Sequence, residues 1–352
     1  MSKVVVIGTG TMGVGIAASF LTFSANTILL GRDTQKARLS LSKVEACADS
    51  INPAWREGGA QLTAGTIADW SDWENTDLII ETISERLDLK KAIFSELDQR
   101  VPPNIPIGSN SSGFPISDIA QGLKTSHRMF NTHYFMPAHI VPLVEVVLGE
   151  KSDPQIAEQI CNLYRIHGKK PVLVKRDIPG FLANRIQHAL MREALSLVQE
   201  GIASPDDVDT AVRYSFGFRY AAVGPMTQKE ISGWEGMALA AEVIYPSLSN
   251  ITEPPACVMD LVSSGRTGMA KGAGFRGWSP EEAAQMKQVY EMRLKAAFEV
   301  LKISTSPFLF LINQVQPEPK FEIALLVNSS LNFSKLPHFF SIISLILVIS
   351  SI

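Results

Sequence analysis

The chain begins with a short apolar run that passes directly into a glycine-rich turn. Residues 4–7 read Val-Val-Val-Ile, Gly8, Gly10 and Gly13 follow with the spacing G-x-G-x-x-G, and an apolar run occupies residues 14–21. A β-branched run of this kind is typical of a strand buried on both faces of a parallel sheet. We therefore predict a strand, a tight turn and a helix, the unit that begins a dinucleotide-binding α/β domain.

Each glycine of this turn has a physical reason. Gly8 permits the tight turn, Gly10 lets a pyrophosphate approach the backbone, and Gly13 lets the helix pack close to the strand. The free N–H groups at the start of the helix attract phosphates. The residues expected to bind the cofactor here are Gly8, Gly10, Thr11, Met12 and Gly13. The alternative is a glycine-rich turn in another kind of α/β protein.

The composition argues against several classes of protein. The chain has 352 residues, enough for two domains, and a formal net charge of −3 without runs of Lys or Arg, so we expect no nucleic-acid partner. Its three cysteines, Cys47, Cys161 and Cys257, form no disulfide or metal pattern. From these cysteines we expect no metal site and a reducing compartment. Because the first strand begins almost at Met1, we expect no signal peptide and a cytoplasmic location.

The end of the second expected strand, residues 27–30, bears on the choice of cofactor. NAD enzymes of this type usually place an acidic residue there to bond the ribose 2′-OH, whereas this chain has Gly31 and then Arg32. A small residue followed by Arg leaves room for a 2′-phosphate and supplies a planar cation for it. We predict NAD or NADP, with a preference for NADP. Two alternatives are that Asp33 bonds the ribose and that Arg32 has no ligand.

Strands and helices alternate as far as about residue 176. Further strands are expected at residues 77–81, 105–108 and 171–174, and helices at residues 34–50, 87–101 and 157–166. Because ligands lie outside the carboxyl ends of parallel strands, the polar residues 109–112 could present hydroxyls and amides to a substrate. They could equally cap the helix that follows.

Consecutive helices replace this alternation after residue 176. The long helix expected at residues 181–200 ends at Gly201, and helical patterns continue to about residue 300. We therefore predict a dinucleotide-binding domain over residues 1–176 and a helical domain for substrate binding and dimerisation over residues 177–302.

A histidine and a glutamate lie in two apolar segments, His133 within residues 128–137 and Glu145 within residues 140–147. A lone His in such a segment is usually a core residue, and a lone Glu is usually exposed. A Glu inside an apolar run needs a partner, because burying an unpaired charge is unfavourable. Paired, the two suit an alcohol dehydrogenase: the His accepts the hydroxyl proton as hydride leaves, and the carboxylate orients the ring.

Several motifs, taken in order, resemble those of the 3-hydroxyacyl-CoA dehydrogenase family, including its relatives that act on gulonate and carnitine. The matching segments lie within residues 3–300 and are Gly8–Ala17, Ile80–Glu85, Ser109–Ser112, His133–Pro137, Pro142–Glu145, Pro179–Arg185 and Lys271–Phe275. The resemblance implies a Rossmann-type doubly wound sheet followed by an all-helical C-terminal domain, usually the dimer contact. It also implies reversible, NAD(P)-dependent hydride transfer at a secondary alcohol or ketone.

The same resemblance implies roles for individual residues. His133 would be the general base and Glu145 the carboxylate that orients it. Ser112 would bond the substrate oxygen through its hydroxyl, and Asn184 would line the substrate site with its amide. Three residues would lie along the cofactor, namely Glu85, Lys90 and Asn110.

The chain departs from the family pattern at three places. Met136 stands where the family usually has Asn, Gly31 stands at the acidic ribose position, and residues 33–77 are shorter than the arm that holds CoA. We therefore expect a small 3-hydroxy acid or related carbonyl compound as substrate. The alternatives are a 3-hydroxyacyl-CoA dehydrogenase proper and a non-catalytic, dinucleotide-binding structural protein.

The composition changes after about residue 302. Residues 303–352 contain only four charged side chains, Glu318, Lys320, Glu322 and Lys335, and end in a long apolar stretch. That stretch is at the short end for a membrane span. A tail anchor and an element packed on the dimer are two interpretations of this atypical hydrophobic tail. We favour a third, translated non-coding sequence.

Overall fold

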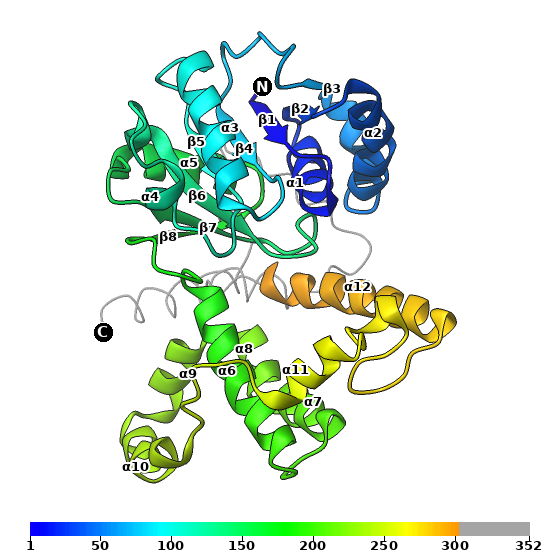
Figure 1. Cartoon of the computed structure of the whole chain (residues 1–352), viewed down its shortest axis with the longest axis vertical. Coiled ribbons are helices and arrows are strands. Elements are labelled where there is room, and N and C mark those ends of the chain that lie inside the picture. Colours follow the sequence, from blue (N-terminus) through cyan, green and yellow to red (C-terminus); the bar gives the residue numbers. More distant parts are fainter. Residues whose placement is uncertain (303–352) are drawn as a thin grey trace, which may run out of the picture. The chain divides into compact units, whose positions relative to one another are not determined.

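The computed structural model describes residues 1–302, in which one large sheet is followed by a series of helices (Figure 1). The strands of the sheet are β1 (Lys3–Ile7), β2 (Asn26–Gly31), β3 (Leu62–Thr66), β4 (Leu78–Glu81), β5 (Ile107–Ser109), β6 (Met129–Tyr134), β7 (Leu143–Leu148) and β8 (Lys170–Val174). The α-helices that accompany them are α1 (Thr11–Leu21), α2 (Thr34–Asp49), α3 (Leu87–Arg100), α4 (Ile116–Ile119) and α5 (Pro154–Ile166).

The sheet has the strand order β3-β2-β1-β4-β5-β6-β7-β8. The strands from β1 to β6 are parallel to their neighbours, whereas β7 runs antiparallel to β6 and parallel to β8. The order reverses at β1, where the chain crosses from one half of the sheet to the other. The prediction of a doubly wound α/β sheet is therefore confirmed.

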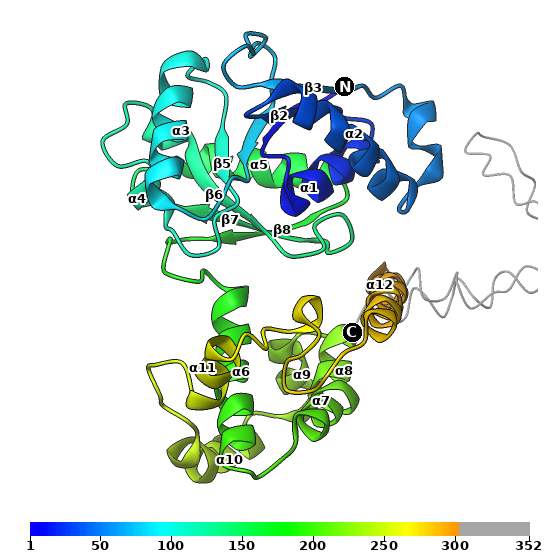
Figure 2. The same ribbon diagram turned by 45° about the vertical axis from the view of Figure 1, so that its right-hand side comes forward.

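Two apolar layers hold the helices against opposite faces of the sheet (Figure 2). Val4 and Val6 of β1 pack with residues of α1, α2 and α5. Val5 and Ile7 pack with residues of α3 and α4. All four side chains are at most 1% exposed, so β1 is buried on both faces, as the β-branched run predicted.

The edge strand β3 was not predicted from the sequence. Its residues read Leu-Thr-Ala-Gly-Thr and include neither an apolar run nor a strict alternation. The strand forms because its backbone pairs with β2 over five residues, and only Thr66 is buried. Pairing with a neighbour therefore outweighs weak local propensity here.

After β8, the described part of the chain forms helices joined by loops, with no further strand beyond two isolated β-bridges within residues 268–277. Its α-helices are α6 (Ala183–Gln199), α7 (Pro205–Tyr214), α8 (Phe216–Ala222), α9 (Pro225–Ser232), α10 (Glu235–Ile244), α11 (Ala256–Ser263) and α12 (Pro280–Lys302). The prediction of an all-helical C-terminal part is confirmed. The proposed boundary near residue 176 falls between Val174 and Ala183 and stays a prediction.

The helical part leaves many large apolar side chains exposed. Examples on five of its helices are Ile186, Tyr214, Phe218, Ile231, Leu239 and Val243. None of the helices from α7 to α11 contains a buried residue. Within residues 1–302, no helix is both long and apolar enough to cross a membrane. The three interpretations of the tail concern residues 303–352, which lie outside the described residues.

Candidate active site

The turn between β1 and α1 has the geometry expected of a phosphate-binding site. Gly8 adopts a φ of 122°, which L side chains rarely adopt, and a Cβ atom on Gly13 would lie 1.9 Å from the carbonyl oxygen of Gly8. A Cβ on Gly10 would meet nothing within 4 Å, so the backbone there is open to a ligand. No acidic residue and no side-chain cap occupy the first turn of α1. The residues present therefore fit the pyrophosphate of a dinucleotide.

The end of β2 contains the residues expected to discriminate between cofactors. A Cβ on Gly31 would lie 3.1 Å from Cγ2 of Thr9 and 3.3 Å from Cβ of Ala37, so little space remains for a larger residue. The Asp33 carboxylate accepts a hydrogen bond of 2.7 Å from the Lys36 amide and so caps α2. Arg32 is exposed, with no hydrogen bond or ion pair to another described residue.

His133 and Glu145 face each other across two antiparallel strands. They are register partners on β6 and β7, and His133 Nδ1 lies 2.7 Å from Glu145 Oε2. His133 Nε2 lies 3.1 Å from Oγ of Ser112, which follows β5. The sheet therefore brings three of the four residues expected to be catalytic into one chain of contacts.

The Glu145 carboxylate has hydrogen-bond donors on both of its oxygens although it is fully buried. Oε1 accepts hydrogen bonds from the backbone amides of Leu182 and Ala183, at 3.0 and 2.8 Å. These donors compensate for the loss of water around the charge. Because an ionised carboxylate only accepts, we assign the imidazole proton to Nδ1 of His133, which leaves a lone pair on Nε2.

The segment before α6 is folded tightly over the histidine. Gly180 and Phe181 both have positive φ angles, of 76° and 49°. For a bulky residue this conformation is strained, and it persists only where the surroundings hold it. The Phe181 ring is buried with its centroid 5.6 Å from that of His133, and the next two amides point at Glu145.

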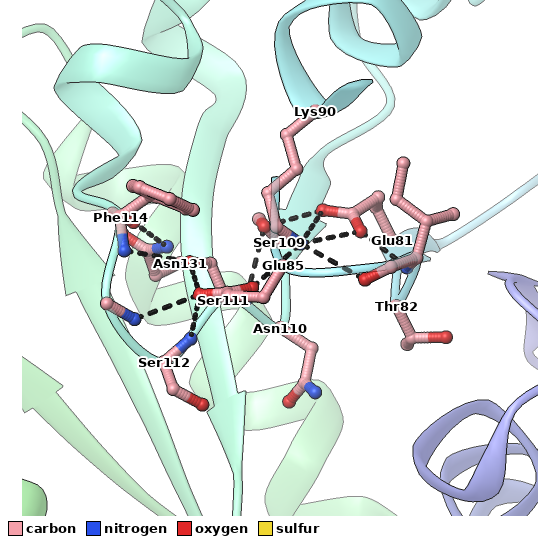
Figure 3. A network of polar contacts seen from close by, with 12 residues as sticks. Glu81, Thr82, Glu85, Lys90, Ser109, Asn110, Ser111, Ser112, Phe114 and Asn131 are labelled. Carbon is pink, nitrogen blue, oxygen red and sulfur yellow. Dashed lines mark hydrogen bonds and ion pairs between the residues drawn. The ribbon is translucent and has the colours of Figure 1, made fainter. Parts of the chain in front are cut away.

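A buried ion pair between Lys90 and Glu81 lies at the ends of β4 and β5, near the loop that carries Ser112 (Figure 3). Lys90 Nζ lies 2.9 and 3.1 Å from the two carboxylate oxygens of Glu81, and both side chains are at most 1% exposed. The Ser109 hydroxyl donates to Glu81 Oε2 at 2.6 Å. Lys90 Nζ also lies 3.3 Å from Oε2 of Glu85. Lys90 is therefore surrounded by carboxylates, and its expected contact with the cofactor stays a prediction.

The other expected site residues make no direct hydrogen bond to the histidine. The Asn110 side chain accepts a hydrogen bond from the Tyr134 amide at 2.9 Å and so ties the end of β5 to β6. Asn184 makes no hydrogen bond to His133 or Ser112; it lines a cavity of about 680 Å³ between α6 and residues 251–258. Met136, which stands at the family's usual Asn position, is 63% exposed.

Sequence reasoning missed three contributors to this site. The backbone amides of Leu182 and Ala183 hold Glu145, and the ring of Phe181 covers His133. Every residue except proline has a backbone amide, so the sequence does not indicate which amides bind Glu145. The residue type Phe does not predict a positive φ either. The third is the buried Glu81 to Lys90 pair, whose nine-residue separation spans a strand end and the first turn of a helix.

Comparison with known proteins identifies similar chains along the described residues. The model of the 3-hydroxyacyl-CoA dehydrogenase NAD-binding domain matches residues 3–178, and that of the C-terminal domain matches residues 180–278. A 5-formyl-3-hydroxy-2-methylpyridine 4-carboxylate 5-dehydrogenase from Mesorhizobium japonicum is 30% identical over 303 residues, covering 85% of this chain and 98% of that protein. An L-carnitine dehydrogenase from Oceanobacillus iheyensis is 34% identical over 251 residues, covering 70% of this chain and 82% of that protein.

A solved structure is similar over most of the length. The crystal structure of 5-formyl-3-hydroxy-2-methylpyridine 4-carboxylic acid 5-dehydrogenase, described as an NAD+-dependent dismutase, superposes with a TM-score of 0.79 at 29% identity. The match covers 86% of this chain and 99% of that chain. Its extent includes both the sheet and the helices that follow it.

Proposed function

The chain belongs to the 3-hydroxyacyl-CoA dehydrogenase family, and from that premise we propose that it oxidises or forms the secondary alcohol of a small 3-hydroxy acid or related carbonyl compound. It is a nicotinamide-dependent oxidoreductase acting on CH–OH groups, and its first domain matches the family's NAD-binding domain. The contact chain from Glu145 through His133 to Ser112 is the observation that carries the catalytic part of the proposal.

In this proposal the three side chains have distinct roles. The nicotinamide, when bound, accepts or returns the hydride. His133 Nε2 takes the proton of the substrate hydroxyl, and the Ser112 hydroxyl bonds the same oxygen. Glu145 keeps the proton on Nδ1 and stabilises the imidazolium that forms. Asn184 would contribute to substrate binding from the cavity between α6 and residues 251–258.

Two observations support a small, anionic substrate. The segment between β2 and β4 holds one helix, a short 3-10 turn (Pro53–Gly58) and β3, and no long helical arm for a CoA group. The cavity beside Asn184 carries the cationic side chains of Arg185 and Arg192 with one acidic residue, Glu253, which favours an anionic substrate. The similar chains include dehydrogenases named for a pyridine carboxylate and for carnitine.

A panel of substrates tests the substrate class. We expect free hydroxy acids to give a higher kcat/KM than the CoA thioester of a short 3-hydroxy acid, measured by nicotinamide absorbance. The thioester reacting as well as the best free acid would overturn the small-substrate proposal and leave the hydride-transfer chemistry standing.

We also propose a preference for NADP over NAD, which rests on Arg32. Replacing Arg32 with alanine is expected to lower kcat/KM for NADPH about 10- to 100-fold, because a charge-assisted bond to a phosphate contributes about 1.5–3 kcal/mol. The value for NADH should change little. Arg38→Ala, which removes an exposed cation on the nearby helix α2, is the matched control. A wild-type enzyme that strongly prefers NADH would contradict the proposal.

The assembly and location of the protein are further proposals. We propose that the helical domain over residues 177–302 forms a homodimer. Its exposed apolar side chains support this, because a second copy would bury them. Multi-angle light scattering of the full chain should give twice the mass of one chain.

Free thiols at Cys47, Cys161 and Cys257 support a cytoplasmic location, which cell fractionation would test.

A further inference from the structure

The turn that carries Ser112 is held by one carboxylate oxygen (Figure 3). Glu85 Oε1 accepts hydrogen bonds from the Ser111 hydroxyl at 2.6 Å, the Ser112 amide at 3.0 Å and the Gly113 amide at 3.1 Å. The Ser111 hydroxyl in turn accepts from the Phe114 amide at 2.9 Å. Three consecutive residues of the turn are therefore tied to a single atom of another loop.

Glu85 is itself fixed from its other side. Its second oxygen lies 3.3 Å from the Lys90 ammonium, which is enclosed against the buried Glu81 carboxylate. Burial alone would raise the pKa of Glu85, but the Ser111 hydroxyl, the Lys90 charge and the Gly113 amide together hold this pKa below its usual value. The carboxylate is therefore ionised at neutral pH, where it can only accept hydrogen bonds.

The position of Ser112 depends on these contacts. Ser111 is buried, whereas Ser112 and Gly113 are exposed to solvent, so packing does little to fix these two residues and their amide contacts with Glu85 matter more. The Ser112 hydroxyl nevertheless has to stay 3.1 Å from His133 Nε2, where the substrate oxygen would bind. A displacement of about 1 Å in such a group can lower the rate about 100-fold.

We propose that Glu85 is a positioning residue, which holds the Ser112 hydroxyl against His133 through its contacts with the 111–113 turn. Lys90 and Glu81 support it from inside the sheet. The proposal rests on the role of Ser112 in the proposed function. It differs from the expectation that Glu85 binds the cofactor, because most of its donors come from the turn.

A double-mutant cycle on the full-length enzyme tests the proposal. Ser112→Ala should lower kcat about 100-fold, as the loss of one hydrogen-bond donor to the reacting oxygen does. Glu85→Ala should lower kcat about 10-fold by misplacing that donor. In the double variant, kcat should equal that of Ser112→Ala, because Glu85 then has no hydroxyl to position. Glu85→Gln retains an acceptor for the turn and should lie between the wild type and Glu85→Ala.

The controls separate this role from two others. Asp88→Ala removes a nearby exposed carboxylate, paired with Arg86 on the surface, and should leave kcat unchanged. The dissociation constant for NADH, measured by fluorescence titration, should be the same for Glu85→Ala as for the wild type. Additive losses of kcat in the cycle, or a weakened affinity for NADH without coupling to Ser112, would overturn the proposal. An unchanged kcat in Ser112→Ala alone would instead refute the role of Ser112 in the proposed function.

Discussion

His133→Ala is expected to lower kcat about 100- to 10,000-fold, the range by which general acid–base catalysis accelerates proton transfer. Nε2 of this histidine is the nitrogen that the buried carboxylate of Glu145 leaves free to take a proton. No other described side chain contacts Ser112 Oγ as a base. Single-turnover measurement of nicotinamide absorbance at saturating substrate reports the loss directly.

Two comparisons make the His133 result decisive. The affinity for NADH should not change, because the glycine turn lies on different strand ends. His127→Ala removes an exposed histidine beside β6 and should retain full activity. The alanine variant leaves Oε2 of the buried Glu145 carboxylate without a donor, which would destabilise the fold. His133→Asn therefore provides a second test: its amide can still donate to Glu145 but cannot take the proton. The mechanism would be ruled out if a folded His133 variant kept a kcat within about 10-fold of the wild type, because losing the general base should lower kcat by far more. That result would favour the non-catalytic structural alternative.

Glu145→Gln should reduce kcat about 1,000- to 10,000-fold, a loss comparable to that seen when the orienting carboxylate of a catalytic triad becomes an amide. The carboxylate accepts from His133 on one oxygen and from the Leu182 and Ala183 amides on the other. A glutamine has one oxygen and one NH2 group. Its NH2 group, which can only donate, must therefore point either at His133 or at the Leu182 and Ala183 amides. If the NH2 group faces His133, the ring changes tautomer and Nε2 can no longer accept a proton.

The opposite orientation of the side-chain amide introduced by Glu145→Gln affects stability. With the NH2 group toward α6, two part-buried backbone amides lose their acceptor, and the free energy of unfolding should fall by about 1–3 kcal/mol. Measuring both kcat and Tm therefore shows which orientation occurs. Glu150→Gln, on an exposed residue just after β7, should alter neither quantity. A Glu145→Gln variant with both wild-type kcat and wild-type Tm would refute the role assigned to this carboxylate.

The predictable part of the fold is the part encoded by neighbouring residues. The β-branched run of β1 and the spacing of Gly8, Gly10 and Gly13 predict a strand, turn and helix because all the constraints act within about 20 residues. The change from alternation to consecutive helices likewise predicts the architecture. The strand β3 escaped prediction, since its backbone pairing with β2 and not its own composition makes it a strand.

The candidate site was predictable as a set of residues but not as a geometry. The resemblance selected His133, Glu145 and Ser112, and twelve residues separate the first two. Their contact depends on β7 turning back antiparallel to β6, with a register that places them opposite each other. A register shifted by one residue would send Glu145 to the other face of the sheet.

The sequence by itself determined the dinucleotide-binding turn, the class of fold and the identity of the residues that chemistry would need. These follow from local propensity, glycine spacing and side-chain chemistry. Only the tertiary structure decided how the two carboxylates are satisfied. The amides that hold Glu145 and the turn that Glu85 holds belong to segments 26 to 38 residues away along the chain. The physical reason is that a buried charge takes whichever donors the folded backbone brings to it, and residue type does not identify a backbone N–H.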